Sequence, residues 1–287
     1  MSYKSIVALT FGHAGDACAI GFAASLAITH KARAHIFPFV PDPSLDLISY
    51  GMLLGTALPE ETAAAILESQ KRLREDLETL CRRACNEVDL VYGEGEGLPR
   101  LNLFRPAGRP EIAISHALAL ADLVVISQES LLASAAAREA FGQVLLQQRS
   151  PILIARGEPD ALGNPVMIAW DGSAEAGRAV RQALPLIAMA SGATAVQCQD
   201  GLDRLAANPS FDPLLNYLKA HSVGEARTEA LEEGPEGEAL VQAAKRLNAG
   251  LVVAGAYGHT RLREAIFGGA TRALLEDRAG PSLLLAH

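Results

Sequence analysis

Short apolar runs alternate with helix-patterned segments along the chain, and the same order of segments occurs twice. The runs lack polar alternation, which is typical of parallel strands covered on both faces. Strands that alternate with helices in this way indicate right-handed βαβ units and a parallel sheet in each half, hence an α/β fold. The expected strands are residues 5–11, 34–40, 88–92, 122–127 and 151–155 in the first half, and 166–171, 193–199, 226–230, 251–254 and 281–285 in the second.

The repetition predicts two copies of one domain. Residues 158–164 carry prolines, glycines and polar residues between two clear patterns, as a linker does, so we expect domains at 1–157 and 164–287. In the first domain, residues 93–108 are expected to form a glycine- and proline-rich loop. Residues 41–59 form a second expected loop, whose unusual apolar content predicts that it covers a site or meets a partner.

The composition narrows the classes of partner. Of 287 residues, 49% are hydrophobic, which suffices for a full core, and the formal net charge is −8. Duplex binding needs a basic face, so we expect a small-molecule or protein partner and no nucleic acid. The sequence has no apolar stretch of about 18 residues and no signal-peptide layout, so we expect no membrane partner and a cytoplasmic location.

The four cysteines show no paired framework. Cys81 and Cys85 lie one turn apart on a long helix that is expected to begin near Glu60. A metal site there would need two further ligands, which the neighbouring sequence does not offer. We therefore expect reduced thiols that pack in the core, and no metal site.

Glycines follow the strand at 251–254. Gly255 ends the apolar run, Gly258 comes three residues later, and Gly268 and Gly269 precede a helical pattern. A helix N-terminus carries free backbone N–H groups and the positive end of the macrodipole, and glycines beside it leave room for a phosphate. The alternative is that these glycines only shape a tight connection between strand and helix, and their spacing alone leaves both interpretations open.

Asp171 ends the first strand of the second half. In an open doubly wound sheet, ligands bind beyond the carboxyl ends of the strands where the strand order reverses. If the first and fourth strands are neighbours, that crevice lies between Asp171 and Gly255, and Asp171 can accept a hydrogen bond from an exocyclic amine. Because Asp-Gly-Ser before a helix is also typical of a helix cap, the capping interpretation has nearly equal weight.

These residues carry a family resemblance. The spacing Gly255-x2-Gly258-x9-Gly268, the position of Asp171 and the final apolar run at 281–285 resemble the universal stress protein family, and the two halves resemble a tandem member. The resemblance implies a flavodoxin-like or Rossmann-like sheet of five parallel strands in each half, flanked by helices and ordered 3-2-1-4-5. It also implies an intramolecular pseudo-dimer through the last strands, as well as binding of ATP, with or without Mg²⁺. Further dimerisation and any protein partner stay open.

The resemblance also implies which residues hold the nucleotide. Asp171 would contact adenine, and the glycine region would contact phosphate and ribose. His259 directly follows Gly258 and is the best candidate to neutralise a phosphate. The residues expected at phosphate and ribose are Gly255, Gly258, Gly268, Gly269, Ala270 and Thr271.

Two departures from the family pattern bear on binding. Gly269 stands where the family's ATP-binding pattern has Ser or Thr, so a hydroxyl donor is missing although the backbone N–H remains. In the first half, residues 126–130 have no glycine pair, Thr10 takes the place of Asp171, and Glu129 would place a carboxylate where phosphate charge belongs. We therefore expect the first half not to bind ATP in this way.

Three functions are compatible with these patterns. The first is a stress-response or regulatory protein that binds ATP or a related adenine nucleotide in its C-terminal half, with little turnover. The second is a nucleotide-free interaction protein that uses the 41–59 loop. The third is an enzyme that acts on a small phosphorylated substrate, with His259 or His13 in a catalytic role, although a Walker-type phosphate loop is absent. We favour the first and expect no dedicated catalytic residues, without excluding slow ATP hydrolysis.

Overall fold

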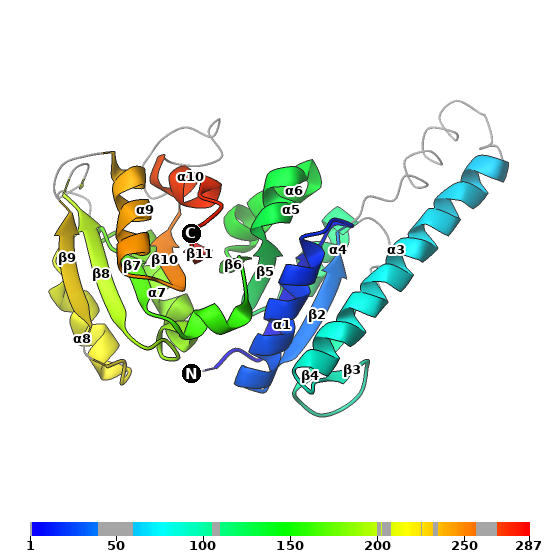
Figure 1. The fold of residues 1–287 in the computed structure, drawn as a ribbon, viewed down its shortest axis with the longest axis horizontal. Coiled ribbons are helices and arrows are strands. Elements are labelled where there is room, and N and C mark those ends of the chain that lie inside the picture. The colour runs from blue at the N-terminus through cyan, green and yellow to red at the C-terminus, as the bar shows by residue number, and fades with distance from the viewer. Residues whose placement is uncertain are drawn as a thin grey trace.

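The computed structural model describes residues 2–39, 60–104, 110–199, 202, 208–224, 226–231, 235–256 and 269–287. Its strands form one sheet that runs through both halves of the chain in the order β3-β4-β2-β1-β5-β6-β11-β10-β7-β8-β9 (Figure 1). The strands are β1 (Ser5–Thr10), β2 (Arg33–Pro38), β3 (Val91–Tyr92), β4 (Arg100–Leu103), β5 (Leu123–Ser127), β6 (Ile152–Ala155), β7 (Val166–Ala169), β8 (Ala193–Cys198), β9 (Arg227–Leu231), β10 (Leu251–Gly255) and β11 (Ser282–Ala286).

The two halves meet at the centre of this sheet. All the strand pairs are parallel except β6 with β11, which is antiparallel, with Leu153 opposite Leu284. In the C-terminal half the order is β9-β8-β7-β10-β11, so the first and fourth strands of that half are neighbours. This adjacency is the condition on which the predicted crevice depends.

The third strand of the N-terminal half differs from the sequence expectation. Residues 93–108 were expected to be a loop, but Arg100–Leu103 forms β4 and pairs with β2, while β3 is only a two-residue strand at the outer edge. The described residues of the N-terminal half therefore form six strands, where five were expected. The guanidinium of Arg100 donates to the carbonyls of Gly93 and Glu94, which ties the loop before β4 to the strand itself.

Helices cover both faces of the sheet, as the apolar runs predict. The core on one face includes residues of α1, α3, α7 and α8, and the core on the other includes residues of α4, α5, α6, α9 and α10. The helices are α1 (Asp16–His30), α3 (Glu60–Glu87), α4 (Pro110–Leu118), α5 (Gln128–Ala133), α6 (Ala135–Gly142), α7 (Ala174–Ile187), α8 (Asp212–Ala220), α9 (Glu236–Arg246) and α10 (Gly269–Glu276). A π-helical turn, Gln143–Gln148, continues α6.

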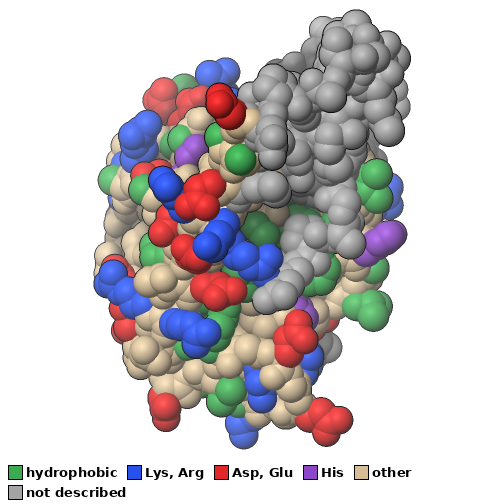
Figure 2. Space-filling view, turned by 90° about the vertical axis from the view of Figure 1, so that its right-hand side faces the viewer, with side chains coloured by type: hydrophobic (Ala, Val, Ile, Leu, Met, Phe, Trp, Pro, Cys, Tyr) green, Lys and Arg blue, Asp and Glu red, His purple; other side chains and the backbone are tan. Residues whose placement is uncertain are grey.

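Acidic and basic side chains are interspersed on the face that includes α3 (Figure 2). Along α3 they pair at i,i+4 spacing, for example Arg72 with Glu68 at 3.1 Å and Arg83 with Glu87 at 2.9 Å. Such exposed pairs stabilise the helix only slightly. Because neither sign predominates, this face is not the basic surface that a nucleic acid needs.

Cys81 and Cys85 lie on the inner side of α3 and are buried in the core. Burial raises the pKa of Cys81 to about 12 and that of Cys85 to about 11, so both stay thiols at neutral pH. Among the described residues, no group of three or more His, Cys, Asp or Glu side chains could hold a metal ion. None of the described helices is long and apolar enough to cross a bilayer.

The segment expected to link the halves is ordered and packed. It forms a 3-10 helix, Pro159–Gly163, in which Leu162 is buried. A Cβ added at Gly250 would lie 1.7 Å from the carbonyl oxygen of Ala161, so the loop before β10 runs directly against this turn. The connection therefore contributes to the core shared by both halves.

Candidate functional site

The strand order reverses at β7, which lies between β8 and β10. Ile168 of β7 is in register with Val253 of β10, so the residues that follow both strands emerge at the same edge of the sheet. Asp171 and Gly255 are therefore brought to one place from positions far apart in sequence. This is the point at which doubly wound sheets bind ligands.

Asp171 is half-buried in the turn between β7 and α7. Its Oδ1 accepts a hydrogen bond from the amide of Ser173 at 2.9 Å. The N-cap of α7 is Ser173, whose Oγ accepts from the amide of Ala176 at 3.1 Å. The sequence left open whether Asp171 caps the helix; the structure gives that position to Ser173, while Asp171 orders the turn before it.

Gly255 permits a close contact between β10 and the first turn of α7. A Cβ added there would lie 2.6 Å from the amide nitrogen of Ala176 and 2.9 Å from the Cβ of Glu175. Only glycine allows this approach without a shift of the helix. Glu175 thus lies beside the proposed crevice, where its carboxylate pairs with Arg178. Sequence analysis did not identify Glu175, because its proximity to Gly255 arises only from packing.

The first turn of α10 contains three of the predicted residues. Gly269 is exposed, and a Cβ added to it would meet nothing within 4 Å, whereas Thr271 is buried. The flank of α10 lies against Gly237 of α9, where a Cβ would lie 2.5 Å from the Cβ of Ala273. Of the predicted site residues, Gly258, His259 and Gly268 lie outside the described part of the chain, as does the 41–59 loop.

Residues 208–210 cross the end of β7. The indole nitrogen of Trp170 donates to the carbonyl of Ser210 at 3.0 Å, and Gln197 Nε2 donates to the carbonyl of Pro209 at 2.7 Å. A Cβ added at Gly172, whose φ is +78°, would lie 2.0 Å from the carbonyl oxygen of Asn208. Residues 208–210 therefore pack directly against the turn that contains Asp171.

Strand register matches the two halves residue by residue. The matching pairs are Ile6 with Leu123 and Val166 with Leu251. The loops after β1 and β7 agree with this match, because Gly12 and Gly172 both have positive φ, at +74° and +78°. Phe11, and not Thr10 as the sequence suggested, therefore corresponds to Asp171. The N-terminal half has a phenylalanine where the C-terminal half has its acidic residue.

The corresponding strand ends of the N-terminal half have an acidic side chain of their own beside them, that of Asp16. The carboxylate of Asp16 accepts hydrogen bonds from the amides of Phe11, Gly12 and His13 at 2.8–3.2 Å, and it is only 1% exposed. Burial raises the pKa of Asp16, while these amide bonds act in the opposite direction. Sequence analysis expected Glu129 to supply the negative charge here, but Glu129 is exposed and Asp16 supplies it.

The contact beside Asp16 mirrors the one at Gly255. A Cβ added at Gly15 would lie 2.4 Å from the Oγ of Ser127, the residue that ends β5. In the N-terminal half the glycine is the N-cap of α1, and in the C-terminal half it is the last residue of β10, Gly255. Both halves thus have a close contact between a strand end and the start of a helix, but the glycine lies on opposite sides of that contact.

Comparisons with known proteins agree with this architecture. Residues 164–278 match the model of the universal stress protein family. A universal stress protein from Archaeoglobus fulgidus DSM 4304 has a similar structure, with 12% identity, a TM-score of 0.66 and coverage of 98% of this chain and 95% of that one. A proposed universal stress protein from Pseudomonas aeruginosa UCBPP-PA14 has 13% identity, a TM-score of 0.54 and coverage of 99% and 93%. At these identities the likeness shows the fold. No curated protein matches the sequence.

Proposed function

Residues 164–278 belong to the universal stress protein family, and on that premise we propose that the C-terminal half binds ATP or a related adenine nucleotide with little turnover. The protein would act as a regulatory or stress-response protein in the cytoplasm. The N-terminal half would carry no nucleotide. Its role in the proposal is structural, as the partner of the binding half in one sheet.

The observation that carries this proposal is that Asp171 and Gly255 lie together at the edge of the C-terminal sheet where the strand order reverses. Helix α10, whose first turn contains Gly269, follows β10 in the chain. A polyphosphate needs room beside the backbone donors of a helix N-terminus, and Gly269 leaves such room because a Cβ there would meet nothing within 4 Å. The carboxylate of Asp171 suits an exocyclic amine of the base.

The charges near this edge also fit the proposal. Glu175 would repel a phosphate if it stood alone, but Arg178 pairs with it and offsets its charge. Mg²⁺ bound to the nucleotide would further reduce the repulsion, and Mg²⁺ prefers carboxylate and phosphate oxygens of this kind. By contrast, the carboxylate of Asp16 already engages the loop amides of the N-terminal half.

Thermal unfolding with and without MgATP tests the proposal. At a nucleotide concentration of about one hundred times Kd, binding to the folded state adds about 2.7 kcal/mol to the free energy of unfolding. We expect such a shift for the wild type with ATP, ADP or AMP. The absence of any shift at millimolar concentrations of all three would favour the nucleotide-free interaction protein instead.

Gly269→Asp makes the test specific to the site. The new side chain has space and favours the helix N-terminus, so the protein should keep its stability, yet its negative charge occupies the place proposed for phosphate. We expect the nucleotide-induced shift to disappear. Gly192→Asp is the matched control, because Gly192 also has nothing within 4 Å and precedes β8 at the other end of the sheet. If Gly269→Asp kept the full shift, the proposed cradle would be wrong.

A further inference from the structure

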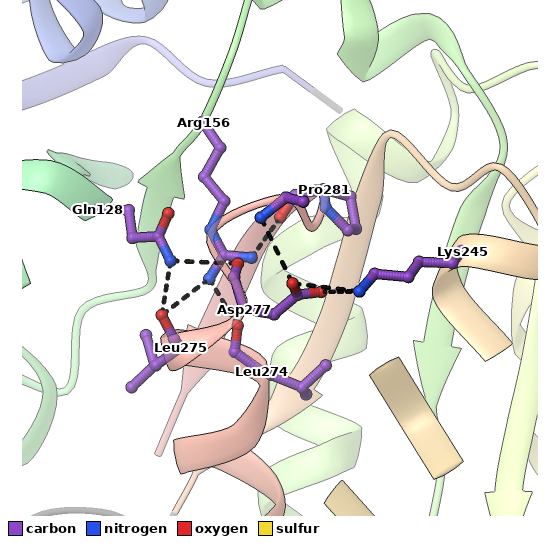
Figure 3. Close-up of polar contacts among 8 residues, drawn as sticks. Gln128, Arg156, Lys245, Leu274, Leu275, Asp277 and Pro281 are labelled. Carbon is purple, nitrogen blue, oxygen red and sulfur yellow. Dashed lines mark hydrogen bonds and ion pairs between the residues drawn. The ribbon is translucent and has the colours of Figure 1, made fainter. Parts of the chain in front are cut away.

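Helix α10 begins in the proposed nucleotide site, but its other end is held by the N-terminal half. The guanidinium of Arg156, which follows β6, donates from Nη2 to the carbonyl of Leu274 at 2.6 Å and from Nη1 to the carbonyl of Pro281 at 2.8 Å (Figure 3). The last carbonyls of a helix have no partner within the helix itself. One side chain from the other half thus satisfies the end of α10 and the start of β11.

Gln128 completes this contact. It is the first residue of α5 in the N-terminal half, and its Nε2 donates to the carbonyl of Leu275 at 2.6 Å and to that of Asp277 at 3.2 Å (Figure 3). Both Gln128 and Arg156 are buried. Two side chains of the N-terminal half therefore bind three backbone carbonyls at the C-terminal end of α10, those of Leu274, Leu275 and Asp277.

The position of Arg156 is fixed by its backbone as well as by its side chain. Its amide donates to the Oγ of Ser282 at 3.2 Å, and that hydroxyl donates to the Arg156 carbonyl at 3.4 Å. Burial lowers the pKa of Arg156 to about 10, with Asp277 acting in the opposite direction, so the guanidinium stays charged at neutral pH. It lies at the negative end of the α10 macrodipole, where a cation is stabilising.

The matching position in the C-terminal half does something else. Register equates Arg156 with His287, since each directly follows the last strand of its half. His287 Nδ1 lies 3.0 Å from the carbonyl oxygen of Ala256, which belongs to its own half. The N-terminal half thus supplies a cap to α10 of the C-terminal half, whereas His287 contacts a carbonyl of its own half.

We propose that Arg156 and Gln128 are positioning residues for the nucleotide site, acting through α10. This inference rests on the proposed function. A helix of eight residues is about 12 Å long and moves as a unit, so a contact that fixes its last carbonyls also fixes the amides of its first turn. The N-terminal half, which holds no nucleotide of its own, would thereby set the affinity of its neighbour.

The test compares Arg156→Met with Arg138→Met and the wild type. Arg138 is a matched control, because its Nη1 caps the carbonyls of Leu131 and Leu132 at the end of α5, within the N-terminal half. We measure MgATP affinity by calorimetry and amide hydrogen exchange across residues 269–277 without nucleotide. Arg156→Met should raise Kd about tenfold, a size usual for coupled sites, and speed exchange in α10, whereas Arg138→Met should change neither.

Gln128→Ala is the second variant, should Arg156→Met fail to fold, and it is expected to change both readouts in the same direction by a smaller factor. Because coupling between two sites is reciprocal, bound nucleotide should slow amide hydrogen exchange in α5 of the wild type. In the variants, nucleotide should no longer slow exchange in α5. A purely structural role of these residues would not produce this difference. Wild-type affinity and wild-type α10 exchange in both variants would overturn the proposal. If the wild type binds no nucleotide, the proposed function fails, and exchange without nucleotide alone decides whether the N-terminal half fixes α10.

Discussion

The carboxylate of Asp16 accepts a hydrogen bond from the amide of Gly12 at 2.8 Å, in the loop between β1 and α1. The amides of Phe11 and His13 donate to the same carboxylate, and the hydroxyl of Ser130 lies 3.4 Å from it. In the N-terminal half, the backbone amides of the loop after β1 therefore bind an anion that belongs to the protein itself, the carboxylate of Asp16. Register puts Ala176, which has no carboxylate, at the corresponding position of the C-terminal half.

Asp16→Ala should destabilise the protein by about 2 kcal/mol, because it leaves buried amide donors without a partner. Asp16→Asn keeps one acceptor oxygen and should cost less. Urea unfolding of both variants measures the difference. Equal stability of Asp16→Ala and the wild type would show that the amides of residues 11–13 do not depend on this carboxylate.

Gly237→Ala should destabilise the contact between α9 and α10. Replacing glycine by alanine inside a helix normally raises the free energy of unfolding by about 0.5–1 kcal/mol. Here, however, the added Cβ would lie 2.5 Å from the Cβ of Ala273 and 3.0 Å from the carbonyl oxygen of Gly269. Overpacking of this kind costs about 1–3 kcal/mol and outweighs the gain. Gly21→Ala in α1, where a Cβ meets nothing within 4 Å, should stabilise instead. A shift of the same sign in both variants, in thermal unfolding, would contradict this packing.

Gly269→Ser restores the hydroxyl that the family pattern has at this position. Because a side chain there has open space, we expect normal folding and an ATP affinity about tenfold higher, which corresponds to the lower end of the value of one hydrogen bond to a charged group. Calorimetric titration of both proteins measures the ratio. An unchanged affinity would indicate that residue 269 does not face the phosphates.

Acid should destabilise the protein through His30. Burial, followed by the charges of Lys4 and the N-terminus, lowers the pKa of His30 below its ordinary value of 6.5, so the unfolded state takes up the proton first as the pH falls. The stability that neutral His30 contributes is present above pH 6.5 and is lost below it. His30→Phe, which keeps an aromatic ring at the edge contact with Tyr3, should lose less stability than the wild type between pH 7.5 and 5.5 in urea unfolding. An equal loss in both proteins would exclude His30 as the cause.

The sequence predicts those elements that are buried on both faces. Apolar runs such as residues 123–127 and 251–254 appear as β5 and β10 because helices cover both sides of the sheet. The strand Arg100–Leu103 was not predicted, because Arg100 and Asn102 interrupt the apolar pattern and glycines precede them. In a strand of four residues, local β propensity is a weak predictor, because pairing with β2 determines the conformation.

The sequence predicted the residues of the candidate site that belong to its motif, but not the residues that packing brings to it. Asp171 and Gly255 could be paired from the expected strand order, and the structure brings them to one edge. Glu175 was missed, because its contact with Gly255 depends on how closely α7 approaches the sheet. Arg156 was missed for a similar reason: its partner Leu274 lies 118 residues away, and no local pattern connects a strand end to a helix in the other half.

The number of nucleotides bound per chain tests the central claim most directly. Calorimetric titration of the wild type with MgATP should give one site per chain, because the C-terminal crevice is proposed to accept phosphate while Asp16 occupies its counterpart. Gly269→Asp should reduce that number to zero. Two sites per chain, or one site that survives Gly269→Asp and disappears with a substitution in the N-terminal crevice, would contradict the account.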